Sequence, residues 1–164
     1  KYDGAAHGAP IRGVALAMNE PVGTIGMICP DDYPLLGLIS LIAPALTMGN
    51  TCVVIPSEPY PLAATDLYQV FETSDLPAGV VNLVTARNEE VIESISGHMD
   101  LDAVWYFGSS GLSSTVEKLS STNLKRTWVN HGKQRNWTDI KQGEGQEFLR
   151  QSTEVKNIWI PYGE

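Results

Sequence analysis

The sequence predicts a doubly wound α/β domain, and three observations support that fold class. Short apolar runs rich in β-branched residues alternate with longer amphipathic segments through residues 23–129. This alternation is typical of crossover units, in which a helix connects two parallel strands. Hydrophobic residues make up 43% of the 164 residues and charged residues 18%, a balance that fits one globular domain with a substantial core.

Each element of the core follows from a local pattern. The apolar runs predict strands at residues 23–28, 51–55, 79–84, 102–107 and 124–129. The segments between them predict helices at residues 35–48, 62–73, 89–95 and 112–119. The run 51–55 (TCVVI) is apolar throughout, as in a parallel strand covered on both faces. Gly49 suits the end of the first helix and Pro61 the start of the second.

Further elements are predicted outside this core. Residues 13–19 (GVALAMN) read as a strand that leads into a turn at Pro21, and residues 156–162 (KNIWIPY) as a final strand. Pro161 suits the edge of a sheet because it has no N–H to donate. Residues 134–145 are expected to form a polar surface connection, with Trp137 as a core or interface anchor, and residues 146–155 a short helix.

Composition excludes several classes of function. The net charge of −8 argues against a nucleic-acid partner, which needs clustered lysine and arginine. The apolar stretch 35–48 is too short to cross a bilayer, so no membrane association is expected. The three histidines and two cysteines show no metal-ligand spacing. Cys29 and Cys52 lie in apolar runs and read as reduced, buried thiols of a cytoplasmic protein. The chain starts without Met, which suggests a piece of something longer.

Residues 103–114 (AVWYFGSSGLSS) raise the question of a ligand. An apolar strand meets a glycine-containing turn and then a helix-like segment. Such a turn can cradle a phosphate because N–H groups at the helix N-terminus point toward the anion. The alternative is a strand-to-helix turn with no ligand.

The order of several motifs resembles the NAD(P)-dependent aldehyde dehydrogenases. Residues 19–58 are similar to the first βαβ unit of that family, and 76–86 (LPAGVVNLVTA) to its next crossover. The matching later motifs are YFGSSGLSS (106–114), NLKRTWVNHGK (123–133) and RQSTEVKNIWI (150–160). The resemblance implies a Rossmann-like cofactor domain at 21–133, flanked by an oligomerisation strand in 1–20. Residues 134–164 would then hold a linker, a short helix and a second oligomerisation strand.

The resemblance also implies that the catalytic groups are missing. The family's general-base glutamate corresponds to Val129, which cannot accept a proton, and its oxyanion-binding amide to Asp32, whose carboxylate would repel an oxyanion. The family's nucleophilic cysteine belongs to a domain that precedes the C-terminal strand, and only residues 134–150 fill that interval here. The resemblance therefore predicts a non-catalytic module in which Asp32 and Val129 occupy vestigial catalytic positions. It resembles the truncated second module of family 16 aldehyde dehydrogenases.

The expected cofactor contacts are incomplete. Pro30, Ser57, Glu58, Gly108 and Ser109 match family positions that contact NAD(P). The family's ribose-binding lysine, however, corresponds to Ile55, and the last glycine of its cofactor turn to Ser113. No tight cofactor binding is therefore expected, and the turn is read as a retained piece of scaffold. Two alternatives stay open: a residual NAD(P)-binding regulatory domain, or a cofactor-domain fragment of an active dehydrogenase.

The strands at both ends of the chain are the candidates for assembly. In the family, strands at these positions pair with a neighbouring subunit, and an edge strand invites pairing with another chain. The expected interface residues are Leu16, Met18, Ile158, Trp159 and Ile160. The expected partners are a second copy, forming a dimer, and a full aldehyde dehydrogenase module of the same polypeptide. The alternative is that these strands pair only within their own chain.

Overall fold

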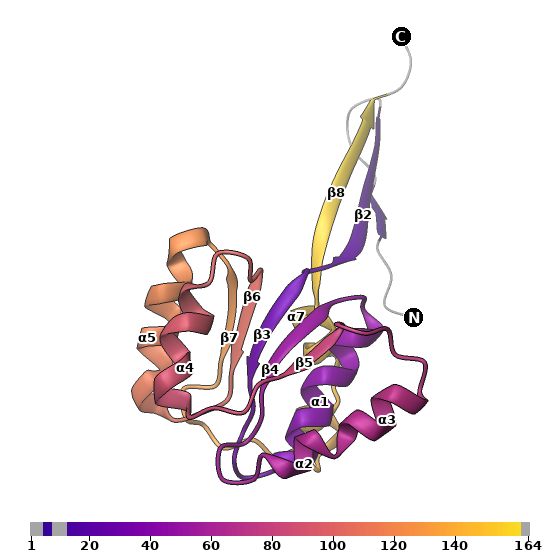
Figure 1. Ribbon diagram of the computed structural model, residues 1–164. Coiled ribbons are helices and arrows are strands. Elements are labelled where there is room, and N and C mark those ends of the chain that lie inside the picture. The colour runs from indigo at the N-terminus through magenta and orange to yellow at the C-terminus, as the bar shows by residue number, and fades with distance from the viewer. Residues whose placement is uncertain (1–4, 8–12, 162–164) are drawn as a thin grey trace.

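The computed structural model describes residues 5–7 and 13–161, and it has two parts (Figure 1). An α/β body holds a parallel sheet between two layers of helices, and a long antiparallel arm projects from that body.

The sheet of the body consists of five parallel strands in the order β5-β4-β3-β6-β7. They are β3 (Thr24–Ile28), β4 (Thr51–Ile55), β5 (Val81–Leu83), β6 (Ala103–Tyr106) and β7 (Arg126–Val129). The chain forms β3, β4 and β5 in that order toward one edge of the sheet. It then returns to the other side of β3, where it forms β6 and β7. Ligands of such sheets bind beyond the carboxyl ends of the strands at this point of reversal, here between β3 and β6.

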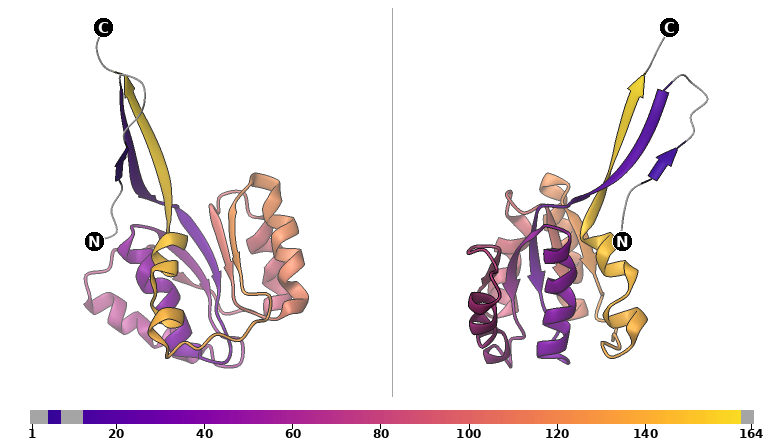
Figure 2. Two further views of the ribbon diagram at one scale, coloured as in Figure 1. Left: turned by 180° about the vertical axis from the view of Figure 1, so that it is seen from behind. Right: turned by 90° about the vertical axis from the view of Figure 1, so that its right-hand side faces the viewer.

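Helices cover both faces of the sheet, which confirms the doubly wound fold (Figure 2). One face carries α1 (Pro34–Thr47), α2 (Leu62–Thr65), α3 (Leu67–Thr73) and α7 (Gln146–Gln151). The other face carries α4 (Asn88–Gly97) and α5 (Ser110–Ser120). The remaining helical segments are η1 (Ser121–Asn123) and α6 (Ile140–Gly143).

Two hydrophobic clusters form the core, one on each face of the sheet. Alternate residues of a strand point to opposite faces, so Trp105 of β6 packs in the cluster with α1 and α7. Its neighbours Val104 and Tyr106 pack in the cluster with α4 and α5. Because both faces are buried, the central strands are apolar on both faces after their first residue, which is the pattern that predicted them.

Three expectations for local structure were wrong. The helix expected at 62–73 is two helices that meet at Asp66, since α2 buries Ala64 against the core while α3 has no buried residue. The strand expected to end at a Pro21 turn runs through Pro21, which pairs with Thr153. The last helix ends at Gln151, and residues 153–155 extend the final strand instead. Pairing with residues 19–21 overrides the weak helix preference of Thr and Val there.

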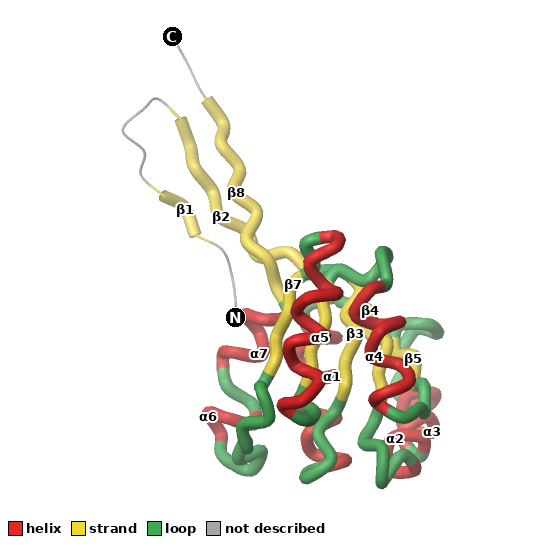
Figure 3. The backbone as a smooth tube through the Cα atoms, turned by 90° about the vertical axis from the view of Figure 1, so that its left-hand side faces the viewer, coloured by secondary structure: helices red, strands yellow, loops and turns green. Residues whose placement is uncertain are grey.

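The arm is a separate antiparallel sheet in the order β1-β2-β8. Its strands are β1 (Ala5–His7), which the sequence reading did not anticipate, β2 (Gly13–Pro21) and β8 (Thr153–Pro161). It leaves the body where the parallel strands begin, at the end opposite their carboxyl ends (Figure 3). Tyr162, expected in the final strand, lies outside the described residues.

The base of the arm is anchored to the body by two polar side chains. The buried Asn50 donates from Nδ2 to the carbonyl oxygens of Ala45 and Ser152, and its Oδ1 accepts from the N–H of Gly23. Arg126 of β7 donates to the carbonyl oxygen of Thr153 at the start of β8. Both anchors converge on the junction between α7 and β8.

Candidate functional site

Two clefts lie along the carboxyl edge of the sheet. The first cleft, of about 320 Å³, is at the point of reversal, between residues 30–32 after β3, residues 107–109 after β6, and residues after β7 up to Trp137. The second cleft, of about 290 Å³, follows β4 and β5 and includes Ser57, Glu58 and Arg87. This edge is where α/β sheets bind ligands.

The structure divides the predicted cofactor residues between these clefts. Pro30, Gly108 and Ser109 line the first cleft, and Ser57 and Glu58 line the second.

Asp31 links the two clefts, a role that the sequence reading missed. Its Oδ1 accepts a hydrogen bond from the Ser57 hydroxyl at 2.9 Å and another from the N–H of Glu58 at 3.0 Å. The carboxylate therefore occupies two donors that would otherwise be free to bind an anionic or hydroxyl-bearing ligand.

The Glu58 carboxylate also accepts a hydrogen bond from within the chain. Its Oε2 accepts from the N–H of Asn88, the first residue of α4, at 3.0 Å. A carboxylate at a helix N-terminus is stabilised by the unpaired N–H groups and the helix dipole. A ribose hydroxyl would have to share this carboxylate with the helix.

The glycine turn before α5 is shaped by a buried tyrosine. The Tyr106 hydroxyl donates to the carbonyl oxygen of Ser109 at 3.0 Å, and burial raises the pKa of Tyr106 above its ordinary value. A Cβ on Gly108 would come within 2.6 Å of the Tyr106 oxygen. Gly108 is therefore required by packing, whether or not a phosphate ever binds.

The chain itself lies against the start of α5. A Cβ on Gly132, which has φ of +69°, would come within 2.9 Å of the Ser110 Cβ and 3.0 Å of the Ser110 nitrogen. The loop after β7 therefore reaches the first residue of α5 and narrows access to the N–H groups of its first turn.

The two residues predicted at vestigial catalytic positions lie in different surroundings. Asp32 is exposed and lines the first cleft, whereas Val129 is partly buried and packs on the cluster of the α4–α5 face.

Neither thiol is poised for nucleophilic chemistry. Cys29 and Cys52 are unpaired and buried. Burial raises the pKa of Cys52 from 9.0 to about 12 and raises the pKa of Cys29 strongly as well. Reactive cysteines have lowered pKa values and access to solvent.

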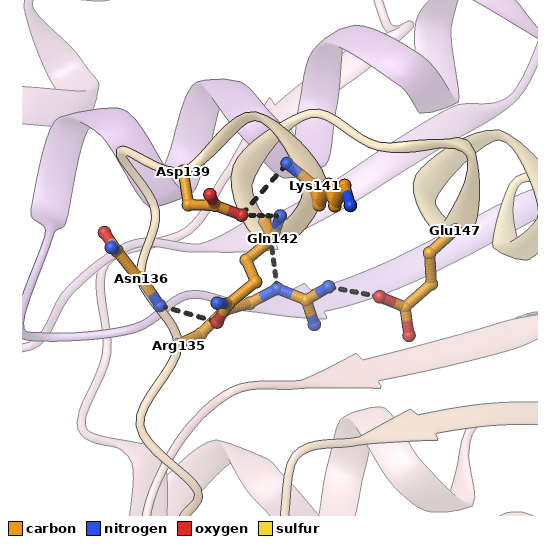
Figure 4. A network of polar contacts seen from close by, with 6 residues as sticks. All are labelled: Arg135, Asn136, Asp139, Lys141, Gln142 and Glu147. Atoms are coloured by element: carbon orange, nitrogen blue, oxygen red, sulfur yellow. Dashed lines mark hydrogen bonds and ion pairs between the residues drawn. The ribbon is translucent and has the colours of Figure 1, made fainter.

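A polar network behind the first cleft escaped the sequence reading (Figure 4). Residues 134–145 were expected to be a polar surface connection, and Trp137, predicted as a core or interface anchor, is buried in the core. Arg135 donates to the carbonyl oxygen of Gln142 and forms an ion pair with Glu147. The available signal was the pair of aromatic residues, Trp137 and Phe148, within an otherwise polar stretch.

The expected interface residues all lie on β2 and β8, but on two faces of the arm. Leu16 pairs with Ile158 across the strands, and cross-strand partners share a face. Met18 and Ile160 lie on the same face as that pair, whereas Trp159 is opposite Ala15 on the other. Met18, Ile160 and Trp159 are exposed, at 47%, 49% and 66%.

The described part of the chain shows neither a membrane-spanning helix nor a cluster of metal-binding side chains. Within residues 5–7 and 13–161, no helix is long and apolar enough to cross a membrane. No group of three or more histidine, cysteine, aspartate or glutamate side chains in that same part of the chain could hold a metal ion.

Comparison with known proteins gives a consistent result. Horse aldehyde dehydrogenase 1A1 is 40% identical over 115 residues, which are 70% of this chain and 23% of that protein. The NADP/NAD-dependent aldehyde dehydrogenase PuuC of Escherichia coli (strain K12) is 37% identical over 120 residues, which are 73% of this chain and 24% of that protein. The chain thus spans about a quarter of the length of these relatives.

Solved structures agree with the sequence comparison. A crystal structure of betaine aldehyde dehydrogenase from Staphylococcus aureus in complex with NAD⁺ superposes with a TM-score of 0.75 at 32% identity. The superposition covers 79% of this chain and 26% of that one. The sequence model of the aldehyde dehydrogenase family matches residues 4–137. The chain, with its α/β body and β arm, belongs to the aldehyde dehydrogenase family.

Proposed function

We propose that this chain is a non-catalytic aldehyde dehydrogenase-like module that serves assembly within a larger protein of the family. The observation that carries the proposal is the state of the catalytic positions. The resemblance to the family assigns Val129 to the general-base position and Asp32 to the oxyanion position, while both thiols are buried with raised pKa values. The described residues therefore offer neither a thiolate nor a base at the positions where the family's mechanism needs them.

The state of the clefts supports weak or absent cofactor binding. Asp31 occupies the Ser57 and Glu58 donors, and its negative charge opposes a pyrophosphate near this edge. Glu58 is bound to α4, and the start of α5 faces the Gly132 loop.

The arm supports a role in assembly. Val14, Met18 and Ile160 are exposed apolar residues on one face, and β8 has a hydrogen-bonded neighbour on one side among the described strands. A long strand with a free edge is a template for pairing with another chain. We propose that its partners are a second copy of the chain and a full aldehyde dehydrogenase module of the same polypeptide, as in the second module of family 16 enzymes. We also propose a cytoplasmic location, which suits two unpaired thiols.

Catalysis and cofactor binding are tested together with the isolated chain. We expect no turnover of an aldehyde panel with NAD⁺ or NADP⁺, and no thermal shift at millimolar cofactor. A ligand at 100 times its dissociation constant would stabilise the fold by about 2.7 kcal/mol, which such a measurement detects readily. Horse aldehyde dehydrogenase 1A1 serves as the positive control. Aldehyde turnover by this chain would refute the proposal.

Assembly is tested by sedimentation of the wild type and of two arm variants. Met18→Lys and Trp159→Lys place a charge on opposite faces of the arm. We expect a dimer for the wild type and dissociation for at least one variant, which also identifies the face that is buried. Glu72→Lys on α3 is the matched control and should leave the oligomer unchanged. A wild type that is monomeric at high concentration, alone and with a full module added, would rule out the arm as an interface.

A residual NAD(P)-binding domain is the second candidate. It is favoured by two clefts of about 320 and 290 Å³ at the carboxyl edge of the sheet, and by the NAD⁺ held in the similar Staphylococcus aureus structure. A cofactor-dependent thermal shift without turnover would support this candidate. If turnover appears once missing parts of a longer chain are supplied, the module is a fragment of an active dehydrogenase.

A further inference from the structure

We propose that residues 135–151 form a separable strap, latched across the α1 face of the sheet by Arg135, whose opening removes one wall of the first cleft. This inference does not depend on the proposed function. The family model matches residues 4–137, so most of the strap lies beyond the matched residues.

The strap closes over the body through aromatic rings. Trp137 and Phe148 are 3% and 1% exposed. The Trp137 ring meets Phe107 at a centroid distance of 5.4 Å, and the Phe148 ring meets Trp128 at 5.2 Å, in edge-to-face geometry. Phe107, which directly follows β6, and Trp128 of β7 belong to the part of the body outside the strap. Edge-to-face pairs add attraction beyond the buried area, so these contacts favour the closed strap.

Arg135 connects the two sets of rings. Its guanidinium carbon lies 5.9 Å from the Phe107 centroid and 5.2 Å from that of Trp128 in the body. It also lies 5.7 Å from Trp137 and 5.0 Å from Phe148 in the strap. A cation over several aromatic faces is attracted by each ring quadrupole.

Among the described residues, the polar partners of the Arg135 side chain belong to the strap. Its Nε donates to the Gln142 carbonyl oxygen, and its guanidinium pairs with the Glu147 carboxylate (Figure 4). The Arg135 side chain is 16% exposed, so its positive charge is largely removed from water. A charge in such a place is costly without hydrogen-bonding partners, and the closed strap supplies them. One side chain thus holds α6 and α7 against the rings of the body.

The strap is braced internally, so it can move as a unit. Asp139 caps α6 by accepting from the N–H groups of Lys141 and Gln142 at 3.1 and 3.0 Å. The Gln142 side chain accepts from the N–H of Asn136 at 3.1 Å. These bonds are local to the strap and would persist when it lifts from the sheet.

The two ends of the strap are held differently. At its C-terminal end, Arg126 donates to the carbonyl oxygen of Arg150, and Asn50 donates to that of Ser152. At its N-terminal end, Arg135 and Trp137 line the first cleft. Opening would therefore pivot about the base of the arm and widen the cleft, while the arm keeps its place.

Hydrogen exchange measured by mass spectrometry on the full chain tests the strap. Arg135→Met keeps an unbranched apolar side chain among the rings but removes the donors and the charge. We expect amides of residues 140–149 to exchange at least ten-fold faster, while β3, β4 and β8 stay within two-fold of the wild type. Glu147→Gln should give a smaller change in the same peptides. Arg87→Met, which removes the exposed ion pair between Arg87, just before α4, and Glu90, is the matched control.

Two outcomes would overturn the proposal. Unchanged exchange in residues 140–149 would show that Arg135 is not the latch. Equal acceleration in the strap and the central strands would show that the strap opens only when the whole body unfolds. If Arg135→Met does not fold, hydrogen exchange of the wild type in low denaturant is the deciding measurement. The proposal requires a lower free energy of opening for the strap amides than for the amides of β3 and β4, and equal values would overturn it.

Discussion

Tyr106 illustrates how one residue can change the meaning of a motif. The glycine turn before α5 has the sequence expected of a phosphate cradle, yet the phenol beneath it fills the space that a Cβ on Gly108 would need. The tyrosine is fully buried and donates to Ser109, so it is held in place. The glycine is explained by the packing of this chain alone.

Substitution of Gly108 tests this packing. Gly108→Ala should destabilise the fold by about 1–3 kcal/mol, because the added methyl group overpacks against Tyr106. The matched control is Gly111→Ala in α5, where a Cβ meets open space; it should stabilise by about 0.5 kcal/mol through reduced backbone entropy. Urea unfolding of both variants measures the difference. Equal stability of Gly108→Ala and the wild type would contradict the packing explanation.

The two buried thiols predict a loss of stability at alkaline pH. The folded-state pKa of Cys52 is raised from 9.0 to about 12, and that of Cys29 is raised too, so above pH 9 only the unfolded chain releases these protons. Proton release favours the unfolded state, and the stability falls as pH rises. Between pH 9 and 10 the two thiols together should cost about 2 kcal/mol.

The comparison that isolates the thiols uses Cys29→Ala/Cys52→Ala. Because every other titrating group is shared, the double variant should lose about 2 kcal/mol less than the wild type over the same pH step in urea unfolding. Identical pH dependence of the two proteins would mean that the thiols are not desolvated in the folded state.

At the scale of elements, the junction of α7 with β8 depends on Asn50. This buried amide connects the end of α1, the start of β3 and the carbonyl oxygen of Ser152. Asn50→Ala would leave the N–H of Gly23 and the Ser152 oxygen without this partner. The expected cost is about 2–4 kcal/mol, since unpaired buried polar groups carry a desolvation penalty.

Thermal and urea unfolding measure that cost. Asn157→Ala on the exposed face of β8 is the control and should stay within about 0.5 kcal/mol of the wild type. If Asn50→Ala lowers the free energy of unfolding no more than the control does, the Asn50 amide is not the anchor of the junction.

For the whole molecule, the arm contributes little to the core. Both hydrophobic clusters consist of residues between Val22 and Phe148, and the buried residues described in the arm are Ala15 and Thr153. A chain of residues 22–152 should therefore fold, with a melting temperature lowered by no more than about 5 °C. Circular dichroism against temperature checks this, and an unfolded truncated chain would contradict it. An arm that the body does not need is available to a partner.

The fold was predictable because its signals are local. The central strands are buried on both faces, so each is a continuous apolar run, and the amphipathic segments between them require crossovers. Where burial is one-sided or weak, local signals failed: Asp66 divides a periodic helix, and β8 begins at Thr153, inside the segment expected to be helical. Pairing between residues 13–21 and 153–161 is a contact between the ends of the chain, which no local pattern encodes.

The sequence by itself determined the doubly wound fold and the family, since both follow from residue types at given positions. Only the tertiary structure decided which groups meet. The Asp31 carboxylate reaches donors 26 and 27 residues away, and the Arg135 guanidinium lies among four rings from separate segments. Such contacts depend on distances across the folded chain, because charge and ring interactions act through space and not along the sequence.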